Sequence, residues 1–244
     1  MSDPWSAAAR SGAITLVLWR HGQTRFNAER RFQGQLDIPL NELGHDQAAR
    51  AARHLAALRP VAIYSSDLSR AVETAGALAR LTGLSVKLDP DLRERSGGEW
   101  EGKSDVELRA QYPDYVTWTT APAAWSPPGG ESGTRVADRA SAALQRIADA
   151  APGGSVTVVV AHGGCLGMGM SRVLGIPDGT RLLGGLGNCR WSVLGRREGK
   201  VRLLEHNVGS LPEPVADAAG DVAVEAEPEV DAVALPEDSG RRED

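Results

Sequence analysis

Short apolar runs alternate along this chain with longer stretches in which apolar residues recur at helical spacing. The runs are rich in β-favouring residues and predict strands at residues 14–19, 61–64, 84–88, 155–161, 190–195 and 200–206. The helical spacing predicts helices at residues 41–58, 66–83, 104–112 and 134–150, and a further helix from Cys165. Strands that alternate with helices predict an α/β fold, with a mostly parallel central sheet, helices on both faces and one antiparallel edge strand.

Cap residues mark the ends of two of these helices. Asn41 has a side-chain oxygen suited to an N-cap, and Gly83 suits a left-handed C-cap. The helix that ends at Gly83 has two candidate N-caps, Ser66 and Asp67. Stretches that are polar, or rich in glycine and proline, predict loops at residues 21–41 and 93–131.

Charge is unevenly distributed between the chain's end and the rest. Residues 211–244 hold eleven acidic residues, two basic residues, four prolines and no aromatic residue. Such a segment buries too little apolar surface to offset its ordering entropy, so we expect an acidic disordered tail. Subtracting the tail's net −9 from the chain's −5 leaves about +4 on the rest. We expect a flexible N-terminus at residues 1–13 and one folded domain at residues 14–210, whose mild charge suits a small anion rather than a nucleic acid.

The two cysteines and the N-terminus indicate the compartment. Cys165 and Cys189 provide neither a disulfide framework nor the spacing of a metal site. The N-terminus has no apolar segment typical of a signal peptide, and the run from Ile14 is too short to span a membrane. We therefore expect a cytoplasmic protein with no membrane partner. The two closing strands offer an edge for a homodimer, although such edges are often merely protected.

Two predicted strands end in the same way, with a histidine followed by a glycine. One ends at Arg20-His21-Gly22 and the other at Ala161-His162-Gly163. Ligands of parallel α/β sheets bind beyond the carboxyl ends of the strands. We expect both histidines at one site, together with Arg70 at the start of a helix and Glu94 on a nearby loop.

Each of these residues alone has an ordinary explanation, such as a solvated arginine or an incidental histidine. Together they predict an anion cradle, because arginine pairs bidentately with phosphate oxygens and the helix N-terminus at Arg70 attracts negative charge. A neutral imidazole can attack phosphorus, and a carboxylic acid can protonate the leaving alkoxide. Gly22 would let the backbone approach the phosphate. This chemistry needs no cofactor or metal, and no acidic cluster with magnesium geometry is evident.

Five separated motifs carry a resemblance to a known family. The stretches "RHGQTRFN", "FQGQLDIPLNELG", "YSSDLSRAVETA", "LRERSGGEWEG" and "VVVAHGG" resemble, in this order, the histidine phosphatase superfamily, which has the phosphoglycerate-mutase-like fold. The resemblance covers roughly residues 14–207. Five motifs in the right order are far more specific than "RHG" alone.

The resemblance implies a role for each matching residue. His21 would be the phosphorylated nucleophile, and the phosphate pocket would consist of Arg20, Arg70 and His162. Glu94 would be the proton donor, with Glu99 and Glu101 as alternatives if the loop register differs. Further candidate substrate contacts are Gly22, Thr24, Asn27, Gln33 and Gly163.

Superfamily members divide into mutases and phosphatases. Residues 110–134 contain no arginine or lysine, whereas resemblance to the mutases would imply extra arginines there. The stretches "WSPPGGES" and "LLGGLGNCRWSVL" are similar to the actinobacterial glucosyl-3-phosphoglycerate phosphatases. The resemblance implies a metal-independent phosphomonoesterase for a small phosphate ester, with glucosyl-3-phosphoglycerate as first candidate. A sugar-phosphate or α-ribazole phosphatase, a phosphoglycerate mutase, and a phosphoprotein phosphatase or binding module remain alternatives.

The leaving group would lie next to the phosphate. We expect the helix from Cys165 and the loop around residues 186–188 to shape its pocket. Three tryptophans of the Pro/Gly-rich segment can either pack in the core or stack on a sugar: Trp100, Trp118 and Trp125. Cys165 lies close to the site, but His21 is the better nucleophile.

Overall fold

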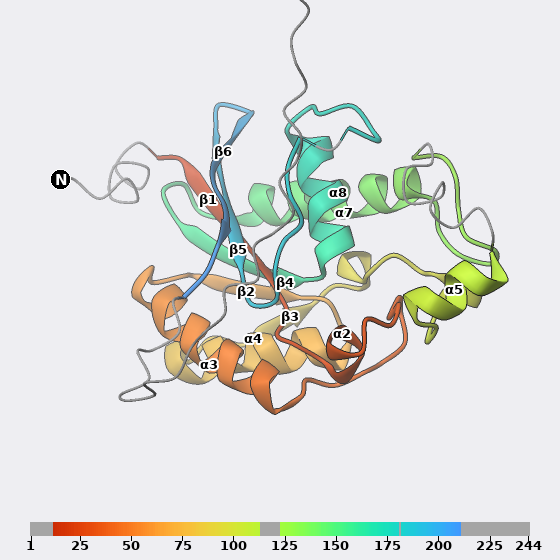
Figure 1. Cartoon of the computed structure of the whole chain (residues 1–244). Coiled ribbons are helices and arrows are strands. Elements are labelled where there is room, and N and C mark those ends of the chain that lie inside the picture. The colour runs from red at the N-terminus through yellow and green to blue at the C-terminus, as the bar shows by residue number, and fades with distance from the viewer. Residues whose placement is uncertain (1–11, 113–122, 181, 211–244) are drawn as a thin grey trace, which may run out of the picture. The chain divides into compact units, whose positions relative to one another are not determined.

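Six strands form one sheet in the order β3-β2-β4-β1-β5-β6 (Figure 1). The structure is a computed structural model that describes residues 12–112, 123–180 and 182–210. The parallel strands are β1 (Ile14–Arg20), β2 (Ala62–Ser65), β3 (Val86–Leu88) and β4 (Val156–Ala161). At one edge, two strands run antiparallel to their neighbours, β5 (Trp191–Arg197) and β6 (Lys200–Val208). The predicted α/β fold and mostly parallel sheet are confirmed, with a pair of strands at the antiparallel edge.

Strands β1 and β4 lie at the centre of the sheet and are apolar on both faces. Along β1, Leu16 and Leu18 pack on one face, while Val17 and Trp19 pack on the other. The parallel register pairs Arg20 with Ala161, so both strands end at the same edge of the sheet. The residues that follow these strands therefore emerge side by side.

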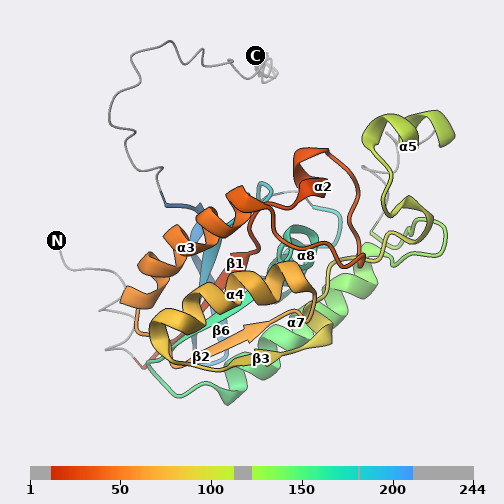
Figure 2. The ribbon, with the colours of Figure 1, turned by 90° about the horizontal axis from the view of Figure 1, so that it is seen from below.

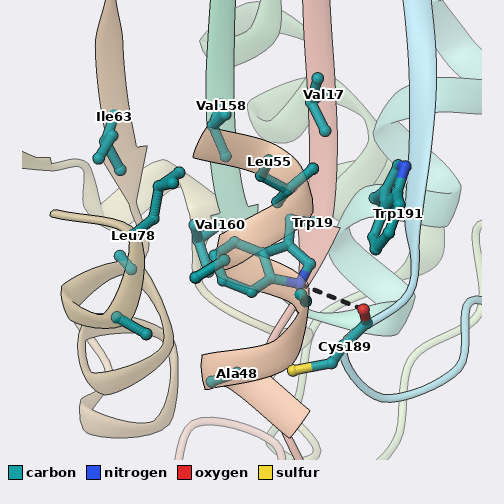
Figure 3. Close-up of a cluster of buried hydrophobic side chains, with 14 of the residues drawn as sticks. Val17, Trp19, Ala48, Leu55, Ile63, Leu78, Val158, Val160, Cys189 and Trp191 are labelled. Carbon is teal, nitrogen blue, oxygen red and sulfur yellow. Dashed lines mark hydrogen bonds between the residues drawn. The ribbon is translucent and has the colours of Figure 1, made fainter. Parts of the chain in front are cut away.

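Two helices cover the face of Val17 and Trp19, α3 (Glu42–Ala57) and α4 (Ser69–Thr82), and Figure 2 shows them side by side. Small residues on α3 and α4 let both helices pack closely on the strands, as Figure 3 shows for Ala48 and its neighbours. Trp19 is fully buried here and donates from Nε1 to the carbonyl oxygen of Cys189 at 3.3 Å. The backbone just before β5 is thereby tied to the end of β1.

The face of Leu16 and Leu18 is covered by α7 (Gly133–Ala150) and α8 (Gly163–Val173). Leu144 of α7 and Leu166 of α8 pack against β1 and β4. A side chain at Gly169 would lie 2.8 Å from Ala140 Cβ, so glycine lets the two helices approach closely. Helices on both faces agree with the prediction, although α8 begins two residues earlier than Cys165.

Two of the predicted caps are confirmed and one is wrong. Asn41 caps α3 by accepting from the Gly44 amide at 2.8 Å, and Gly83 ends α4 with φ of 72°. Helix α4 has Leu68 as N-cap, not Ser66 or Asp67. The Ser66 hydroxyl lies instead against His162, and the Asp67 carboxylate accepts from Arg93. The carboxylate of Asp37, from a distant loop, accepts instead from the Ser69 amide at 2.7 Å.

The two predicted loops contain short helices that the pattern did not reveal. A four-residue helix, α2 (Arg25–Ala28), begins at Thr24 with a capping box closed by Asn27. The second loop contains η1 (Pro90–Leu92) and η2 (Gly98–Trp100), which are single 3₁₀ turns, and the expected short helix, α5 (Asp105–Gln111). Single turns are too short to show helical periodicity in a sequence.

The chain divides into two units, Met1–Ser210 and Leu211–Asp244. The predicted acidic tail, Trp118 and most of the predicted flexible N-terminus lie outside the described residues. Among the helices that are described, none is both long and apolar enough to cross a membrane.

Candidate active site

The histidines that follow β1 and β4 lie together. Because the two strands are paired to their last residues, the His21 amide donates to the Ala161 carbonyl at 3.0 Å. The rings of His21 and His162 have centroids 5.1 Å apart, with planes inclined by 58°. The structure thus brings together the two strand ends that the sequence singled out.

His21 is held in one tautomer. Its Nδ1 lies 2.7 Å from the carbonyl oxygen of Gly22, and a carbonyl only accepts, so Nδ1 carries the proton. In the neutral ring the lone pair is then on Nε2. Burial, and then the charges of Arg20 and Arg70, hold the pKa of His21 well below its ordinary value. His21 is therefore a neutral imidazole at neutral pH, with Nε2 available as a nucleophile.

His162 is fully buried, and both of its ring nitrogens are engaged. Nδ1 accepts from Arg70 Nε at 3.2 Å, which leaves the proton on Nε2, 2.8 Å from the hydroxyl of Ser66. Burial, followed by the charge of Arg70, holds the pKa of His162 well below its ordinary value. In this arrangement His162 orients Arg70 and packs against the ring of His21.

Arg70 is a buried cation at the start of α4. Its Nη1 and Nη2 donate to the carbonyl oxygens of Leu36 and Gly34, both at 2.8 Å. Burial lowers the pKa of Arg70 to about 10, so the side chain remains charged at neutral pH. The backbone of the loop after α2 therefore fixes the guanidinium in place.

Arg20 is the second cation of the site. Its Nη1 donates to the Leu186 carbonyl, while its buried Nε has no hydrogen-bond partner among the described residues. The start of α8 lies against this guanidinium, because a Cβ at Gly163 would be in van der Waals contact with it at 3.4 Å. Burial lowers the pKa of Arg20, and the nearby charge of Glu94 partly opposes this effect. An unpaired buried N–H of a cation is a site for an anion.

A cavity of about 370 Å³ lies over these groups. Its lining contains six of the residues predicted from the sequence: Arg20, His21, Asn27, Gln33, Arg70 and Glu94. His162, Thr24, Gly22 and Gly163 do not line it, although Gly163 lines the neighbouring cavity. The structure therefore separates the candidate residues into those that can touch a ligand and those that hold them.

The geometry distinguishes among the three candidate proton donors. Glu94 lines the cavity, and its carboxylate accepts from the amides of Gly164 and Cys165, both at 2.9 Å, at the start of α8. Glu101 accepts instead from the amides of Gln35 and Gly97, and Glu99 is exposed. Of the three, only Glu94 is placed to exchange a proton with a molecule in the cavity.

Thr24, Asn27 and Gln33 form a polar cluster beside the cavity. Thr24 is fully buried, and its hydroxyl lies 2.9 Å from Gln33 Oε1 and accepts from the Asn27 amide at 3.1 Å. Thr24 thus positions Asn27 and Gln33, which line the cavity.

Gly22 has a constraint in the fold besides its expected role at the phosphate. A side chain here would lie 2.4 Å from the carbonyl oxygen of Gly44, so the glycine is required where the end of β1 passes over the start of α3. Its amide donates to Thr74 Oγ1 at 3.1 Å. Gly22 serves close backbone packing, while its carbonyl orients His21.

Three further residues support the site in ways that the sequence did not predict. Asn188 was expected only as part of the leaving-group loop and Ser66 only as a helix cap, and Arg139 was given no role. Asn188 Nδ2 donates to the carbonyl oxygens of His21 (3.1 Å) and Gly22 (3.2 Å). Arg139 of α7 donates to three carbonyl oxygens of the segment that carries Glu94. Ser66 directly follows β2 at the same sheet edge, and this position could have identified it as a site residue. The sequence around Arg139 offers no such signal.

The tryptophans are divided between packing and the surroundings of the site. Trp100 is buried against Trp125, with ring centroids 5.5 Å apart, and against Phe32. Trp125 also lines a second cavity, of about 350 Å³, that adjoins the first. Burial raises the pKa of Cys165 to about 12, so this thiol is not a nucleophile at neutral pH.

Comparison with known proteins agrees with the geometry. The sequence profile of the histidine phosphatase superfamily (branch 1) matches residues 16–209. A glucosyl-3-phosphoglycerate phosphatase from Mycolicibacterium vanbaalenii is 42% identical over 183 residues, which cover 72% of this chain and 81% of the relative. Phosphoglycerate mutase-like protein 4 from Arabidopsis thaliana is 43% identical over 155 residues, 62% of this chain and 67% of the relative.

The similarity extends to solved structures. A mycobacterial glucosyl-3-phosphoglycerate phosphatase in complex with VO3 superposes with a TM-score of 0.76 at 38% identity, over 80% of this chain and 99% of that one. The paired strand-end histidines, the two buried arginines and the match over nearly the whole described chain lead to one conclusion: this protein belongs to the histidine phosphatase superfamily, branch 1.

Proposed function

We propose that this protein is a phosphomonoesterase that hydrolyses a small phosphorylated metabolite through a phosphohistidine at His21. The observation that carries the proposal is the hydrogen bond from His21 Nδ1 to the Gly22 carbonyl. It leaves the Nε2 lone pair available in a cavity that also contains the guanidiniums of Arg20 and Arg70. A neutral nucleophile beside two fixed cations suits attack on a phosphate ester.

In the first step, the phosphate binds to Arg20 and Arg70, and His21 Nε2 attacks phosphorus. The bond from phosphorus to the ester oxygen breaks, and protonated Glu94 gives its proton to the departing alkoxide. The two arginines neutralise charge on the transferring group. Ser66 holds the ring of His162, and His162 in turn holds Arg70 in position. His162 therefore supports phosphate binding through Arg70.

In the second step, water attacks the phosphohistidine. The Glu94 carboxylate takes a proton from this water, His21 is released and inorganic phosphate leaves. The net reaction is ester plus water to alcohol plus phosphate, and Glu94 and His21 are restored. The amides of Gly164 and Cys165 stabilise the Glu94 carboxylate formed after the first step.

Hydrolysis is favoured over mutase activity by the chain's own composition. Residues 110–134 carry no arginine or lysine with which to hold a second phosphate. Among substrates, glucosyl-3-phosphoglycerate is the first candidate, supported by the activity named for the mycobacterial relatives. Mutase activity is the second candidate, because another relative is named a phosphoglycerate mutase-like protein.

The proposal extends to the protein's setting. We propose that the protein is cytoplasmic and that residues 14–210 form its catalytic domain. We expect it to bind small phosphate esters rather than nucleic acids or membranes. A homodimer would form along β6, the last strand of the sheet, where Leu204 is about half exposed. Light scattering on the purified chain tests this arrangement, and a monomeric mass at micromolar concentration contradicts it.

A panel of phosphate esters tests the function. The purified protein is assayed for phosphate release from glucosyl-3-phosphoglycerate, 3-phosphoglycerate, α-ribazole phosphate, simple sugar phosphates and a phosphopeptide. We expect kcat/KM to be highest for a small metabolite ester and to be lost in His21→Ala. Conversion of 3-phosphoglycerate to 2-phosphoglycerate faster than phosphate release would establish the mutase alternative. A preference for the phosphopeptide would establish a protein phosphatase.

A further inference from the structure

The loop that leads into β5 ends beside the nucleophile. Asn188 is partly buried on this loop and lines neither cavity of the site, so it is not placed to touch a ligand. Its side-chain Nδ2 lies 3.1 Å from the His21 carbonyl oxygen and 3.2 Å from both the Gly22 carbonyl oxygen and Asn27 Oδ1. One amide group therefore connects the backbone of the nucleophile with a side chain of the phosphate cavity.

The orientation of this side-chain amide is fixed by its surroundings. Two of the three neighbouring oxygens belong to backbone carbonyl groups, which can only accept, so the atom that faces them must be the nitrogen. The third, Asn27 Oδ1, already accepts from the Thr24 amide at 3.1 Å. The reverse orientation of Asn188 would place its own carbonyl oxygen against three acceptors. Asn188 is thus present as a donor, and a polar side chain without N–H groups would not replace it.

The backbone next to Asn188 holds the amide in place. Cys189 has a left-handed conformation, with φ of 53°, which is uncommon for residues other than glycine and is concentrated at functional sites. The Cys189 amide donates to the His21 carbonyl at 3.1 Å, and its carbonyl accepts from the buried Trp19 at 3.3 Å. These two contacts hold the turn that brings Asn188 to the end of β1.

The Gly22 carbonyl is the acceptor that affects the chemistry. It accepts from His21 Nδ1 at 2.7 Å, and this contact keeps the proton off Nε2. A carbonyl oxygen has two lone pairs, and Asn188 Nδ2 binds the second. Because Nδ2 also binds the preceding carbonyl, it fixes the relative orientation of two consecutive peptide groups. Without this donor, the Gly22 carbonyl would be free to turn from the ring, and His21 could adopt the tautomer that has no lone pair on Nε2.

We propose that Asn188 is a positioning residue that keeps His21 in the tautomer able to attack phosphorus. This inference rests on the proposed phosphatase function and adds to it a residue that is distant in sequence from the nucleophile. Asn188 acts through the Gly22 carbonyl and does not touch the substrate. The same carbonyl then faces the cationic ring of the phosphohistidine, whose Nδ1 still carries its proton, and stabilises that charge.

Two variants remove the donor, and a matched control removes a different amide from the same segment. Asn188→Leu keeps a side chain of similar shape, and Asn188→Ala is too small to collide with its neighbours, so an effect shared by both does not come from collision. The control is Gln47→Met. Gln47 is also partly buried, and its Oε1 accepts at 2.9 Å from the amide of Gln23, the residue after Gly22. This control leaves the donor to the His21 and Gly22 carbonyls intact.

Three measurements separate positioning from folding. The nitrogen chemical shifts of the His21 ring report which nitrogen is protonated, and we expect Nδ1 in the wild type and in Gln47→Met. In both Asn188 variants the shifts should move toward a mixture of the two tautomers. The rate constant for phosphorylation of His21 should fall about tenfold in these variants, roughly the contribution of one hydrogen bond. The inhibition constant of inorganic phosphate should change by less than about twofold, because Arg20 and Arg70 keep their contacts.

Several results would overturn the assignment. A wild-type ring protonated at Nε2 would do so without any variant, and so would unchanged ring shifts in the Asn188 variants. A loss of rate in Gln47→Met as large as theirs would show a general effect of loosening the segment. A loss of phosphate binding equal to the loss of rate would show that Asn188 acts on the phosphate pocket through Asn27. In each case a phosphohistidine on wild-type His21 leaves the proposed function standing, whereas a wild-type protein that forms none overturns both proposals.

Discussion

Arg139 should be the residue outside the cavity whose loss has the largest effect on both stability and turnover. Its guanidinium donates to both carboxylate oxygens of Glu131, at 3.0 and 2.8 Å. It also donates to the carbonyl oxygens of Asp91, Arg93 and Glu94 at 2.7–3.0 Å. Both side chains of the ion pair are largely buried, with 16% and 13% of their surface exposed. Arg139→Met would leave the buried Glu131 carboxylate without its cation, with only the Ser96 amide as donor. The carbonyl groups of Asp91 and Arg93 would lose this donor, while Gln35 would still donate to the Glu94 carbonyl.

The expected loss of stability in Arg139→Met follows from these contacts. Breaking one side of a buried ion pair costs about 3–5 kcal/mol. For a domain of this size, each kcal/mol lowers Tm by roughly 2–4 °C, so we expect a decrease of about 6–20 °C by calorimetry. The double variant Glu131→Gln with Arg139→Met should recover part of this loss, because no charge is left unpaired.

A matched control lies one turn away on the same helix. Arg135 approaches the same carboxylate at 3.8 Å, but 79% of its side chain is exposed. Arg135→Met should therefore change the free energy of unfolding by less than about 0.5 kcal/mol. If the Tm values of Arg135→Met and Arg139→Met differ by less than about 2 °C, which is the smallest shift expected for 1 kcal/mol, the buried ion pair does not stabilise the fold as proposed.

The dependence of kcat on the leaving group is a second readout, which would not change if Arg139 only stabilised the fold. Because Arg139 holds the segment that carries Glu94, its loss should lower kcat for an alkyl phosphate by about 10- to 100-fold. The loss should be much smaller for p-nitrophenyl phosphate, whose leaving group needs little protonation. Equal losses for both esters would show that Arg139 does not act through the proton donor.

Four further predictions concern pH, packing and the tail. Because burial lowers the pKa values of His21 and His162 below the ordinary 6.5, folding favours their neutral forms. Their contribution to Tm should therefore be constant above about pH 6.5 and fall as the pH decreases below that value. The profile of kcat/KM should be bell-shaped, with its acid limb below pH 6.5 for the same reason; a flat profile would contradict the acid–base pair. Gly22→Ala should lower the free energy of unfolding by about 1–3 kcal/mol, because the added methyl group would collide with the Gly44 carbonyl. Gly76→Ala within α4 should be neutral or stabilising. Similar urea midpoints for the two variants would refute this expectation. Deletion of residues 211–244 should leave kcat/KM unchanged, and a lost activity would show that the acidic segment contributes to the site.

The parts of the site that follow strands could be predicted from the sequence. Arg20, His21 and His162 directly follow buried apolar runs, and the parallel pairing of β1 with β4 brings their ends together. The same reasoning placed Arg70 at the start of a helix on that edge. These expectations rest on local periodicity and on topology, which the sequence expresses directly.

The supporting residues could not be found in this way, because their partners are distant along the chain. The sequence contains nothing near Arg139 that indicates contact with residues 91–94, and nothing near Ser69 that indicates capping by Asp37. For Gly22 the sequence predicts only an approach of the backbone to the phosphate. The further constraint at this position, the backbone of Gly44, is revealed only by the packing of the end of β1 against the start of α3.

The most direct test of the central claim is to identify the phosphorylated residue. The wild-type protein is mixed with a phosphate ester and quenched in alkali within milliseconds, since phosphohistidine is labile in acid, and the digest is analysed by mass spectrometry. We predict a single phosphoryl group on His21, formed at least as fast as the steady-state turnover and absent in His21→Ala. Turnover without any phosphorylation of His21, or phosphate on another residue at a competent rate, would contradict the account.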